Sequence, residues 1–250
     1  MKARPARKRL DLLVVERKLA ESREKAAAMI LAGEVRVDGK REDKAGLPVA
    51  GDAKIEVASR HAKYVSRGGF KLEGALKDFS LNPKGLVCLD VGSSHGGFTD
   101  CLLQHGAARV YAVDVNVEQL DWKLRQDTRV VAVRKNAREL ETRDIPERAD
   151  LTVVDVSFIS VEKVVEPAAS LTKPSSLFLI LIKPQFELPR SQVGAGGIVR
   201  SKKLREKAVL SVSKQVKSLG FKFLKVRPSR IGGVEGNQEY FLCARKKSME

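Results

Sequence analysis

The sequence predicts an α/β protein in which a mostly parallel sheet carries helices on both faces, with a small α+β domain before it. From residue 67 onward, apolar segments of strand length alternate with segments of helical pattern, which is typical of a parallel sheet. Residues 9–57 instead show two short helical segments, then short strands and turns. The 250 residues suit one medium and one small domain. We therefore expect a small domain over 1–60, a linker over 61–66 and a larger domain over 67–250.

The N-terminal region begins with an amphipathic helical pattern over 9–17. Ser22 is a good N-cap for a second helix, and Gly33 is a good residue to end it. Residues 35–39 alternate as a strand and then turn at an Asp-Gly pair, and a further strand is expected over 54–57. A core of this size is marginal on its own.

In the larger domain, strands are expected where apolar residues cluster, namely 86–91, 109–114, 129–133, 150–155, 177–182, 221–227 and 239–244. Helical patterns occupy the intervals 97–105, 117–125, 160–171 and 201–218. Seven strands with helices between them predict a Rossmann-like, mostly parallel sheet. Sheets of this kind bind their ligands at the carboxyl ends of the strands.

Composition argues against several classes of protein. Hydrophobic residues make up 43% of the chain, which is enough for a folded core. The longest apolar run, Leu177 to Ile182, is too short to cross a bilayer, and the N-terminus has no apolar stretch of signal-peptide length. We therefore expect a cytoplasmic protein without membrane contact. The three cysteines and three histidines lack metal-ligand spacing, so no metal is expected.

The net charge of +16 favours an anionic partner, and nucleic acid is the first candidate. Residues 200–234 carry 11 Lys and Arg against a single acid, Glu206. So one-sided a segment indicates an RNA-facing flank, with Lys202, Lys203 and Arg205 as its candidate contacts. The alternative is a basic surface that contacts only solvent.

A glycine-rich turn, Asp90 to Phe98, follows the first strand of the larger domain. A strand, a glycine-rich turn and a helix bring backbone close to a ligand in α/β folds. The spacing is not G-x-G-x-x-G, and the pattern D-x-G-x-x-x-G-G fits the loop that wraps S-adenosylmethionine. Asp114 ends the next strand, where a carboxylate can accept hydrogen bonds from ribose hydroxyls. For each feature alone, a plain tight turn or a solvated aspartate is the alternative.

Charged residues also lie at the ends of later strands. Asp155 ends the fourth expected strand, and Lys183 directly follows the fifth. Lys71 and Glu239 add a second base and a second acid. The carboxyl ends of parallel strands meet at one edge of a sheet, where such folds place their ligands. A structural ion pair is the alternative for any one of these residues.

Two lysines and two carboxylates suit the methylation of a ribose hydroxyl. The hydroxyl is a poor nucleophile and must lose its proton as it attacks. A lysine can accept that proton if its pKa falls from about 10.4 toward roughly 7–8. Partial burial and a second lysine lower such a pKa, whereas two carboxylates raise it, so the sequence leaves the net direction open.

These residues resemble the TlyA (hemolysin A) family of ribosomal RNA 2′-O-methyltransferases over nearly the whole chain. The matching segments are Ser66–Leu72, Asp90–Asp100, Ala112–Val115, Asp155–Ser160, Leu181–Glu187 and Gly236–Phe241. Residues 9–57 are similar to the S-four (alpha-L) RNA-binding domain, with Arg9-Leu10-Asp11, Ser22-Arg23-Glu24 and the segment 33–39 in its order. The larger domain resembles the FtsJ-type methyltransferase.

The resemblance implies a class I methyltransferase fold, S-adenosylmethionine as cofactor, and ribosomal RNA or ribosomal subunits as partner. It implies a catalytic tetrad of Lys71, Asp155, Lys183 and Glu239, with Lys183 as the base. The cofactor would be held by Asp90, Gly92, Ser93, Gly96, Gly97, Phe98, Asp114 and Asn136. Besides the basic segment, RNA would be contacted by Arg9, Ser22, Arg23, Arg36, Lys40 and Arg67. The expected product is a 2′-O-methylated cytidine in 16S RNA, 23S RNA or both, made by a monomer or a homodimer.

Three other functions remain as alternatives. A non-catalytic RNA-binding or ribosome-assembly protein could keep a methyltransferase fold, although the intact tetrad argues against it. A nicotinamide-dependent dehydrogenase is disfavoured by the spacing of the glycine loop. The family's hemolysin name implies membrane damage, for which the sequence offers no membrane segment.

Overall fold

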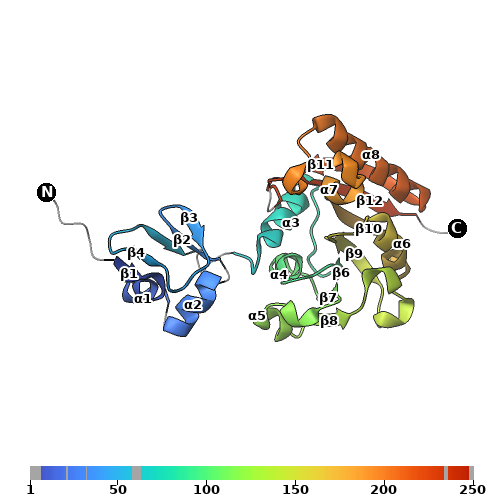
Figure 1. Ribbon diagram of the computed structural model, residues 1–250. Helices are drawn as coiled ribbons and strands as arrows, with labels where there is room; N and C mark the ends of the chain where they lie inside the picture. The colour runs from blue at the N-terminus through green and yellow to red at the C-terminus, as the bar shows by residue number, and fades with distance from the viewer. Residues whose placement is uncertain (1–6, 21, 32, 58–62, 234–235, 248–250) are drawn as a thin grey trace. The chain divides into compact units, whose positions relative to one another are not determined.

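The computed structural model describes residues 7–20, 22–31, 33–57, 63–233 and 236–247. Contacts within the chain divide it into two compact units, residues 1–62 and residues 63–250 (Figure 1). Each unit has a hydrophobic core of its own, and each is described here by itself.

The smaller unit packs two short helices, α1 (Leu10–Glu16) and α2 (Arg23–Leu31), against short strands. The strands in its described part pair antiparallel in the orders β3-β2-β5 and β1-β4. They are β1 (Arg7–Arg9), β2 (Val35–Val37), β3 (Lys40–Glu42), β4 (Pro48–Ala50) and β5 (Ile55–Val57). The core consists of apolar side chains from both helices and from β2 and β4, including Leu10, Val14, Ile30, Val35 and Val49.

Local signals in this unit have the expected effects. The Ser22 hydroxyl accepts a hydrogen bond from the Lys25 amide at 3.2 Å near the start of α2. Gly33, just past α2, has φ +67°. Asp38 and Gly39 both have positive φ, as a tight turn between two antiparallel strands requires. The strands β1, β3 and β4 are not predicted from the sequence, because β1 (Arg-Lys-Arg) and β3 (Lys-Arg-Glu) contain only charged residues and β4 begins with a proline.

The larger unit is a seven-stranded sheet in the order β11-β12-β10-β9-β6-β7-β8. Only β12 runs antiparallel to its neighbours, so the expected mostly parallel, Rossmann-like sheet is confirmed. The strands are β6 (Val87–Val91), β7 (Arg109–Asp114), β8 (Val130–Arg134), β9 (Ala149–Val154), β10 (Thr172–Ile182), β11 (Phe221–Pro228) and β12 (Tyr240–Lys246).

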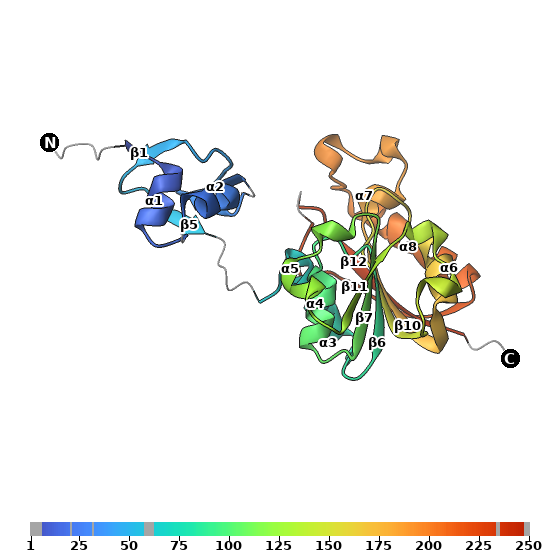
Figure 2. The same cartoon turned by 90° about the horizontal axis from the view of Figure 1, so that it is seen from below.

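Helices cover both faces of this sheet, as Figure 2 shows with the strands nearly edge-on. One face carries α3 (Arg67–Asp78), α4 (Gly97–Gln104) and α5 (Trp122–Arg125), and the other carries α6 (Glu162–Ser170) and α8 (Lys202–Ser218). Alternate residues of β10 serve the two cores: Phe178 and Ile180 pack on the side of α6 and α8, and Leu179 packs on the side of α3 and α4.

The winding of the sheet reverses between β6 and β9. From β6 the chain proceeds outward through β7 to β8, and from β9 it proceeds the other way to β10. The loops after β6 and β9 therefore leave the sheet side by side and turn apart. Ligands of open α/β sheets bind at such a switch point, and the loops 92–96 and 155–161 border it in this chain.

Short single-turn elements complete the unit: α7 (Pro184–Glu187) and the 3-10 helices η1 (Val117–Gln119), η2 (Ala137–Glu139), η3 (Thr142–Asp144), η4 (Arg190–Gln192) and η5 (Ala195–Gly197). The helix expected over 117–125 is in fact η1 and α5, because Leu120 between them is extended and buried. The helix α3 is not predicted, since three glycines within it lower its helical propensity.

Residues 63–66, expected to be linker, pack against the larger unit. Tyr64 is buried, with its ring 5.1 Å from that of Phe70. The Val65 amide donates to the Asp100 carboxylate at 2.8 Å, and Ser66 caps the first turn of α3. Residues 61 and 62 of the expected linker lie outside the described residues.

We predict that Gly97 and Gly74 respond oppositely to alanine. A Cβ at Gly97 would collide with the Ser66 hydroxyl and lie 2.9 Å from the Gly69 nitrogen, so α3 and α4 would have to separate. A Cβ at Gly74 would meet only the flexible side chain of Arg230. Gly97→Ala should lower the free energy of unfolding by about 2 kcal/mol, whereas Gly74→Ala should leave it unchanged or raise it. Urea denaturation measures both, and equal stabilities would contradict the close packing of α3 on α4.

Candidate functional site

The four charged residues predicted at the site form two ion pairs. Lys183, which follows β10, places Nζ 2.5 Å from Oδ1 of Asp155, which follows β9. Lys71, on α3, donates to Oε2 of Glu239 at 2.5 Å, and Glu239 directly precedes β12. The second pair is buried, with Lys71 9% and Glu239 2% exposed, whereas Lys183 and Asp155 are partly open to solvent. The fold thus brings together residues that are up to 168 positions apart.

Two cavities adjoin at this place. The larger cavity, about 920 Å³, lies over the carboxyl ends of β6, β7 and β9 and includes Asp155 in its lining. The smaller cavity, about 430 Å³, is lined by Lys71, Lys183 and Glu239. Three residues line both cavities: Ser157, Phe158 and Phe186. A group bound in one cavity would therefore lie next to a group bound in the other.

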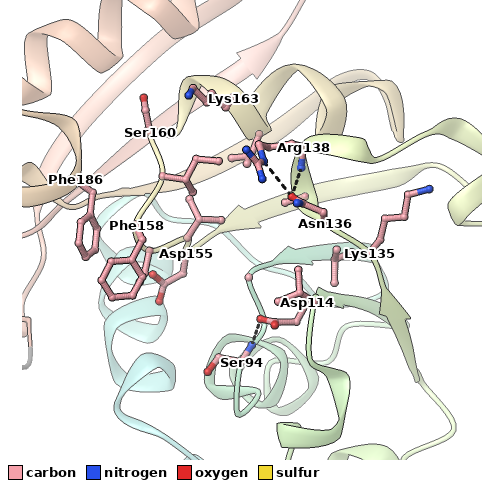
Figure 3. A pocket seen from close by; sticks show the side chains of 18 of the residues that line it. Ser94, Asp114, Lys135, Asn136, Arg138, Asp155, Phe158, Ser160, Lys163 and Phe186 are labelled. Carbon is pink, nitrogen blue, oxygen red and sulfur yellow. Dashed lines mark hydrogen bonds between the residues drawn. The ribbon is translucent and has the colours of Figure 1, made fainter.

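The partition between the cavities has an aromatic residue that the sequence analysis missed. Phe158 is 90% exposed and has φ +64°, a conformation that costs a non-glycine residue free energy. Its ring lies 5.0 Å from that of Phe186, and Figure 3 shows the two rings side by side near Asp155. Ser157 accepts a hydrogen bond from Lys183 Nζ at 2.8 Å. Strained backbone and an exposed aromatic ring indicate a binding surface rather than a contribution to stability.

The glycine-rich loop borders the larger cavity as its spacing predicts. Gly92 has φ +87°, and a Cβ there would collide with the carbonyl oxygen of Asp155, so only glycine fits. Gly96 has φ +91° at the N-terminus of α4, and a Cβ there would collide with Leu124. Gly92 lines the larger cavity, whereas Gly96 and Gly97 support the turn from behind.

Polar residues at the ends of β7 and β8 also line the larger cavity. Asp114 accepts hydrogen bonds from the Ser94 amide at 2.9 Å and from the Asn116 amide at 3.0 Å. Asn136 accepts from the Arg138 amide at 3.1 Å (Figure 3). Asp114 and Asn136 are thus held rigidly with their side chains beside the cavity. Ser94 and Lys135 line it too and were not expected.

Three residues assigned to cofactor binding lie behind this surface. Phe98 is 3% exposed and packs in the core with its ring 6.1 Å from that of Phe241, so its side chain does not line the larger cavity. Asp90 is fully buried and accepts from the Thr99 hydroxyl at 2.6 Å. Its second oxygen and the Ser93 hydroxyl are buried without a hydrogen-bond partner. Unpaired buried polar atoms cost free energy and mark places where a ligand can supply the missing contact.

In the smaller unit, one buried carboxylate organises two of the predicted RNA contacts. Asp11 is 2% exposed and accepts from Arg9 Nη2 at 2.8 Å and from Arg23 Nε at 2.9 Å. The hydrogen bond from Arg9 is the main cause that holds the pKa of Asp11 well below its usual range. Both guanidinium groups remain about half exposed. Arg36 and Lys40 are also exposed, on β2 and β3.

The predicted RNA contacts of the larger unit differ in how exposed they are. Lys202 is 82% exposed, and Lys203 is exposed beside it at the start of α8. Arg67 is exposed, with one donor bonded to the Gly232 carbonyl at 3.2 Å. Arg205 instead donates to the carbonyls of Val199 and Arg200 at 2.9 and 2.8 Å, which ties it to its own backbone.

Two absences hold for the described part of the chain. Its histidine, cysteine, aspartate and glutamate side chains form no group of three that could hold a metal ion. None of its helices is long and apolar enough to cross a membrane.

The strand order, the glycine-rich loop at the switch point and the two lysine–carboxylate pairs together define a Rossmann-like methyltransferase. The FtsJ-like methyltransferase family matches residues 64–246, and the S4 domain family matches residues 8–55.

Similar proteins agree with this class. The 16S/23S rRNA (cytidine-2′-O)-methyltransferase TlyA of Mycobacterium tuberculosis is 43% identical over 97% of this chain and 91% of its own length. Hemolysin A of Brachyspira hyodysenteriae is 42% identical over 93% of this chain and 97% of its own length. A solved structure from Streptococcus thermophilus, also named as a hemolysin, has a TM-score of 0.75 and 38% identity, covering 97% of this chain and 89% of that one. The chain therefore belongs to the FtsJ-like methyltransferase family, within the TlyA group, and carries an S4 domain at its N-terminal end.

Asp90 should give the stability of the protein an unusual pH dependence. Burial raises the pKa of its carboxyl from 3.8 to about 7. The folded chain therefore holds this proton over a range of pH in which the unfolded chain has released it. Stability from this group is present below about pH 4 and is lost as the pH rises to about 7. Asp90→Asn keeps the shape and removes the titration.

The free energy of unfolding of the native protein should therefore fall relative to that of Asp90→Asn as the pH rises. The change in this difference between about pH 4 and about pH 8 should be on the order of 2–4 kcal/mol. Urea denaturation across this range measures it. Parallel pH profiles for the two proteins would show that Asp90 ionises normally.

Proposed function

We propose that this protein transfers a methyl group from S-adenosylmethionine to the ribose 2′-hydroxyl of a cytidine in ribosomal RNA. The observation that carries the proposal is the position of Lys183. Its amine lies in the smaller cavity, directly beside a larger cavity of suitable size for a nucleoside cofactor. The TlyA relative is named for this reaction on 16S and 23S RNA, which supports cytidine as the target and leaves both subunits as candidates.

The larger cavity suits S-adenosylmethionine. Gly92 lets the backbone approach a ligand closely, and Asp114 at the end of β7 offers a carboxylate to the ribose hydroxyls. The buried oxygen of Asp90 and the Ser93 hydroxyl lack partners behind the same loop. When bound, S-adenosylmethionine supplies an electrophilic methyl group on a positively charged sulfur.

The smaller cavity suits the acceptor nucleotide. Phe158 and Phe186 offer aromatic surface on which a base can stack. As the 2′-oxygen forms its bond to the methyl carbon, the hydroxyl proton must leave, and Lys183 Nζ is placed to accept it. Asp155 and Ser157 hold that nitrogen from the side. Lys71 and Glu239, being paired and buried, position the sugar and balance charge.

The S4 domain would supply affinity and placement on RNA rather than chemistry. Arg9 and Arg23, aligned by Asp11, present their remaining donors to phosphate oxygens. Lys202 and Lys203 on α8 add positive charge in the larger unit. Phosphate contacts of this kind position a protein without reading sequence, and they weaken as salt rises.

Methyl transfer to ribosomal subunits tests this proposal. The purified chain should transfer labelled methyl to 30S subunits, 50S subunits or both, and nuclease digestion with mass spectrometry should find 2′-O-methylcytidine. Lys183→Ala should keep the fold and lower the rate on the order of 10²- to 10⁴-fold, the range for loss of a general base. Lys183→Arg should be nearly as slow, because a guanidinium keeps its proton.

Each arm of this experiment separates one alternative. RNA binding and cofactor binding without transfer would indicate an assembly protein that retains a methyltransferase fold. A methyl group on the base instead of the ribose would place the chemistry elsewhere. An active Lys183→Arg variant would leave Lys183 as a positioning residue and remove it as the base.

Asp114 should govern cofactor affinity. Asp114→Ala removes the acceptor at the end of β7, so calorimetry should show weaker binding of S-adenosylhomocysteine, by about tenfold for the loss of charged hydrogen bonds. Asp121→Ala is a matched control, because Asp121 caps α5 outside the lining of the larger cavity. Unchanged affinity in Asp114→Ala would remove Asp114 from the site.

A further inference from the structure

A half-buried carboxylate outside the tetrad joins the two loops that carry the site. Glu187 is the last residue of α7, the single turn that begins directly after Lys183. Its Oε1 accepts from the Val161 amide at 3.0 Å, and its Oε2 accepts from the Ser160 hydroxyl at 2.8 Å. Ser160 and Val161 end the loop that carries Asp155, Ser157 and Phe158. Glu187 thus connects the strand end of β10 to the strand end of β9.

Together with the backbone, these contacts form a closed circuit that passes through Lys183. From Lys183 the chain runs through α7 to Glu187, crosses by hydrogen bonds to Ser160, and runs back to Ser157. Ser157 then accepts a hydrogen bond from Lys183 Nζ at 2.8 Å, which completes the circuit. The contact between the aromatic rings of Phe158 and Phe186 joins the same two loops. Because Lys183 is held both through its backbone and through its side chain, it has little freedom to move relative to Asp155.

This arrangement is costly for stability, which argues that it serves the site. The ion pairs found among the described residues do not include Glu187. Burial raises the pKa of Glu187, and the neighbouring Glu162 adds to this effect. Even a half-buried carboxylate is costly when no cation faces it, and such groups gather at functional sites. The loop it holds is itself strained at Phe158, so it needs a restraint to keep its shape.

We propose that Glu187 is a positioning residue for methyl transfer, which ties loop 155–161 to α7 and thereby holds Ser157 and Asp155 against Lys183. The inference rests on the proposed function, in which Lys183 accepts the proton. Glu187 itself acts through its hydrogen bonds to Ser160 and Val161. Displacement of a reacting group by about 1 Å can lower a rate on the order of 100-fold, so the tie has measurable consequences.

Three variants of the full chain test the tie. Glu187→Ala removes both hydrogen bonds and should lower the single-turnover rate of methyl transfer by about 10- to 100-fold. Its affinity for S-adenosylhomocysteine should fall by less than the rate does, because Glu187 bonds to Ser160 and Val161 and not to Gly92 or Asp114, which are proposed to hold the cofactor. Glu187→Gln keeps an acceptor for Val161 and a polar group for Ser160, so it should retain most of the rate. Glu166→Ala, at an exposed glutamate of α6, is the matched control and should behave as the native chain.

A double-mutant cycle adds a readout that general destabilisation would not move. Ser160→Ala alone should slow transfer by a few-fold, and it should add nothing in the Glu187→Ala background, because both changes break the same contact. Ser160→Ala also keeps the test available if Glu187→Ala does not fold. A native rate in Glu187→Ala would overturn the proposal. So would a Glu187→Gln variant as slow as Glu187→Ala, since charge and not the tie would then matter.

Amide hydrogen exchange separates this inference from the proposed function. In Glu187→Ala the Val161 amide loses its acceptor and should exchange at least about tenfold faster than in the native chain. If the native chain transfers no methyl to ribosomal RNA, the proposed function fails while this readout still decides whether the tie exists. Unchanged exchange at Val161 would refute the tie even in an active enzyme.

Discussion

The lateral position of β9 between β6 and β10 is the constraint on which the candidate site depends. The Asp155 amide donates to the Val91 carbonyl at 2.9 Å, and the Asp155 carbonyl lies so close to Gly92 that no side chain fits there. On its other side, β9 pairs in parallel with β10, which brings Asp155 to Lys183. One strand end thus joins the glycine-rich loop to the lysine. A shift of β9 would disturb both cavities at once, because residues just after it line each of them.

Much of this arrangement follows from the sequence, since the apolar periods and the carboxyl-end rule predict a parallel sheet with Asp155 and Lys183 at one edge. Other features depend on information that a residue pattern does not contain. The three glycines within α3, of which Gly68 and Gly69 pack closely against Phe98 and Tyr64, also hide its helical character. The positive φ of Phe158 is not evident from its residue type, because a bulky side chain seldom adopts this conformation. Glu187 ends a helix of four residues, too short to have a period, and its partners lie 26 and 27 positions away.

The chain handles its buried charges in two ways. Lys71 with Glu239, and Asp11 with two arginines, neutralise each other, so each buried charge has a partner within hydrogen-bonding distance. Asp90 is buried and Glu187 is half-buried, and each accepts a hydrogen bond from a neutral hydroxyl, with a backbone amide as a second donor to Glu187. The unneutralised acids both lie behind loops that border the cavities. This distribution is what a fold shows when local stability is given up to shape a binding site.

A crystal structure of the chain with S-adenosylhomocysteine tests the central claim, that one cavity holds the cofactor and the adjoining one holds the acceptor. The account predicts the adenosine in the larger cavity, with its ribose hydroxyls on Asp114 and its sulfur at the partition beside Ser157, facing Lys183. A ligand whose sulfur faces away from the smaller cavity, or a ligand bound outside the larger cavity, would contradict it. Lys183 could not then serve the transferred methyl group, and the pairing of Asp155 with Lys183 would be structural only.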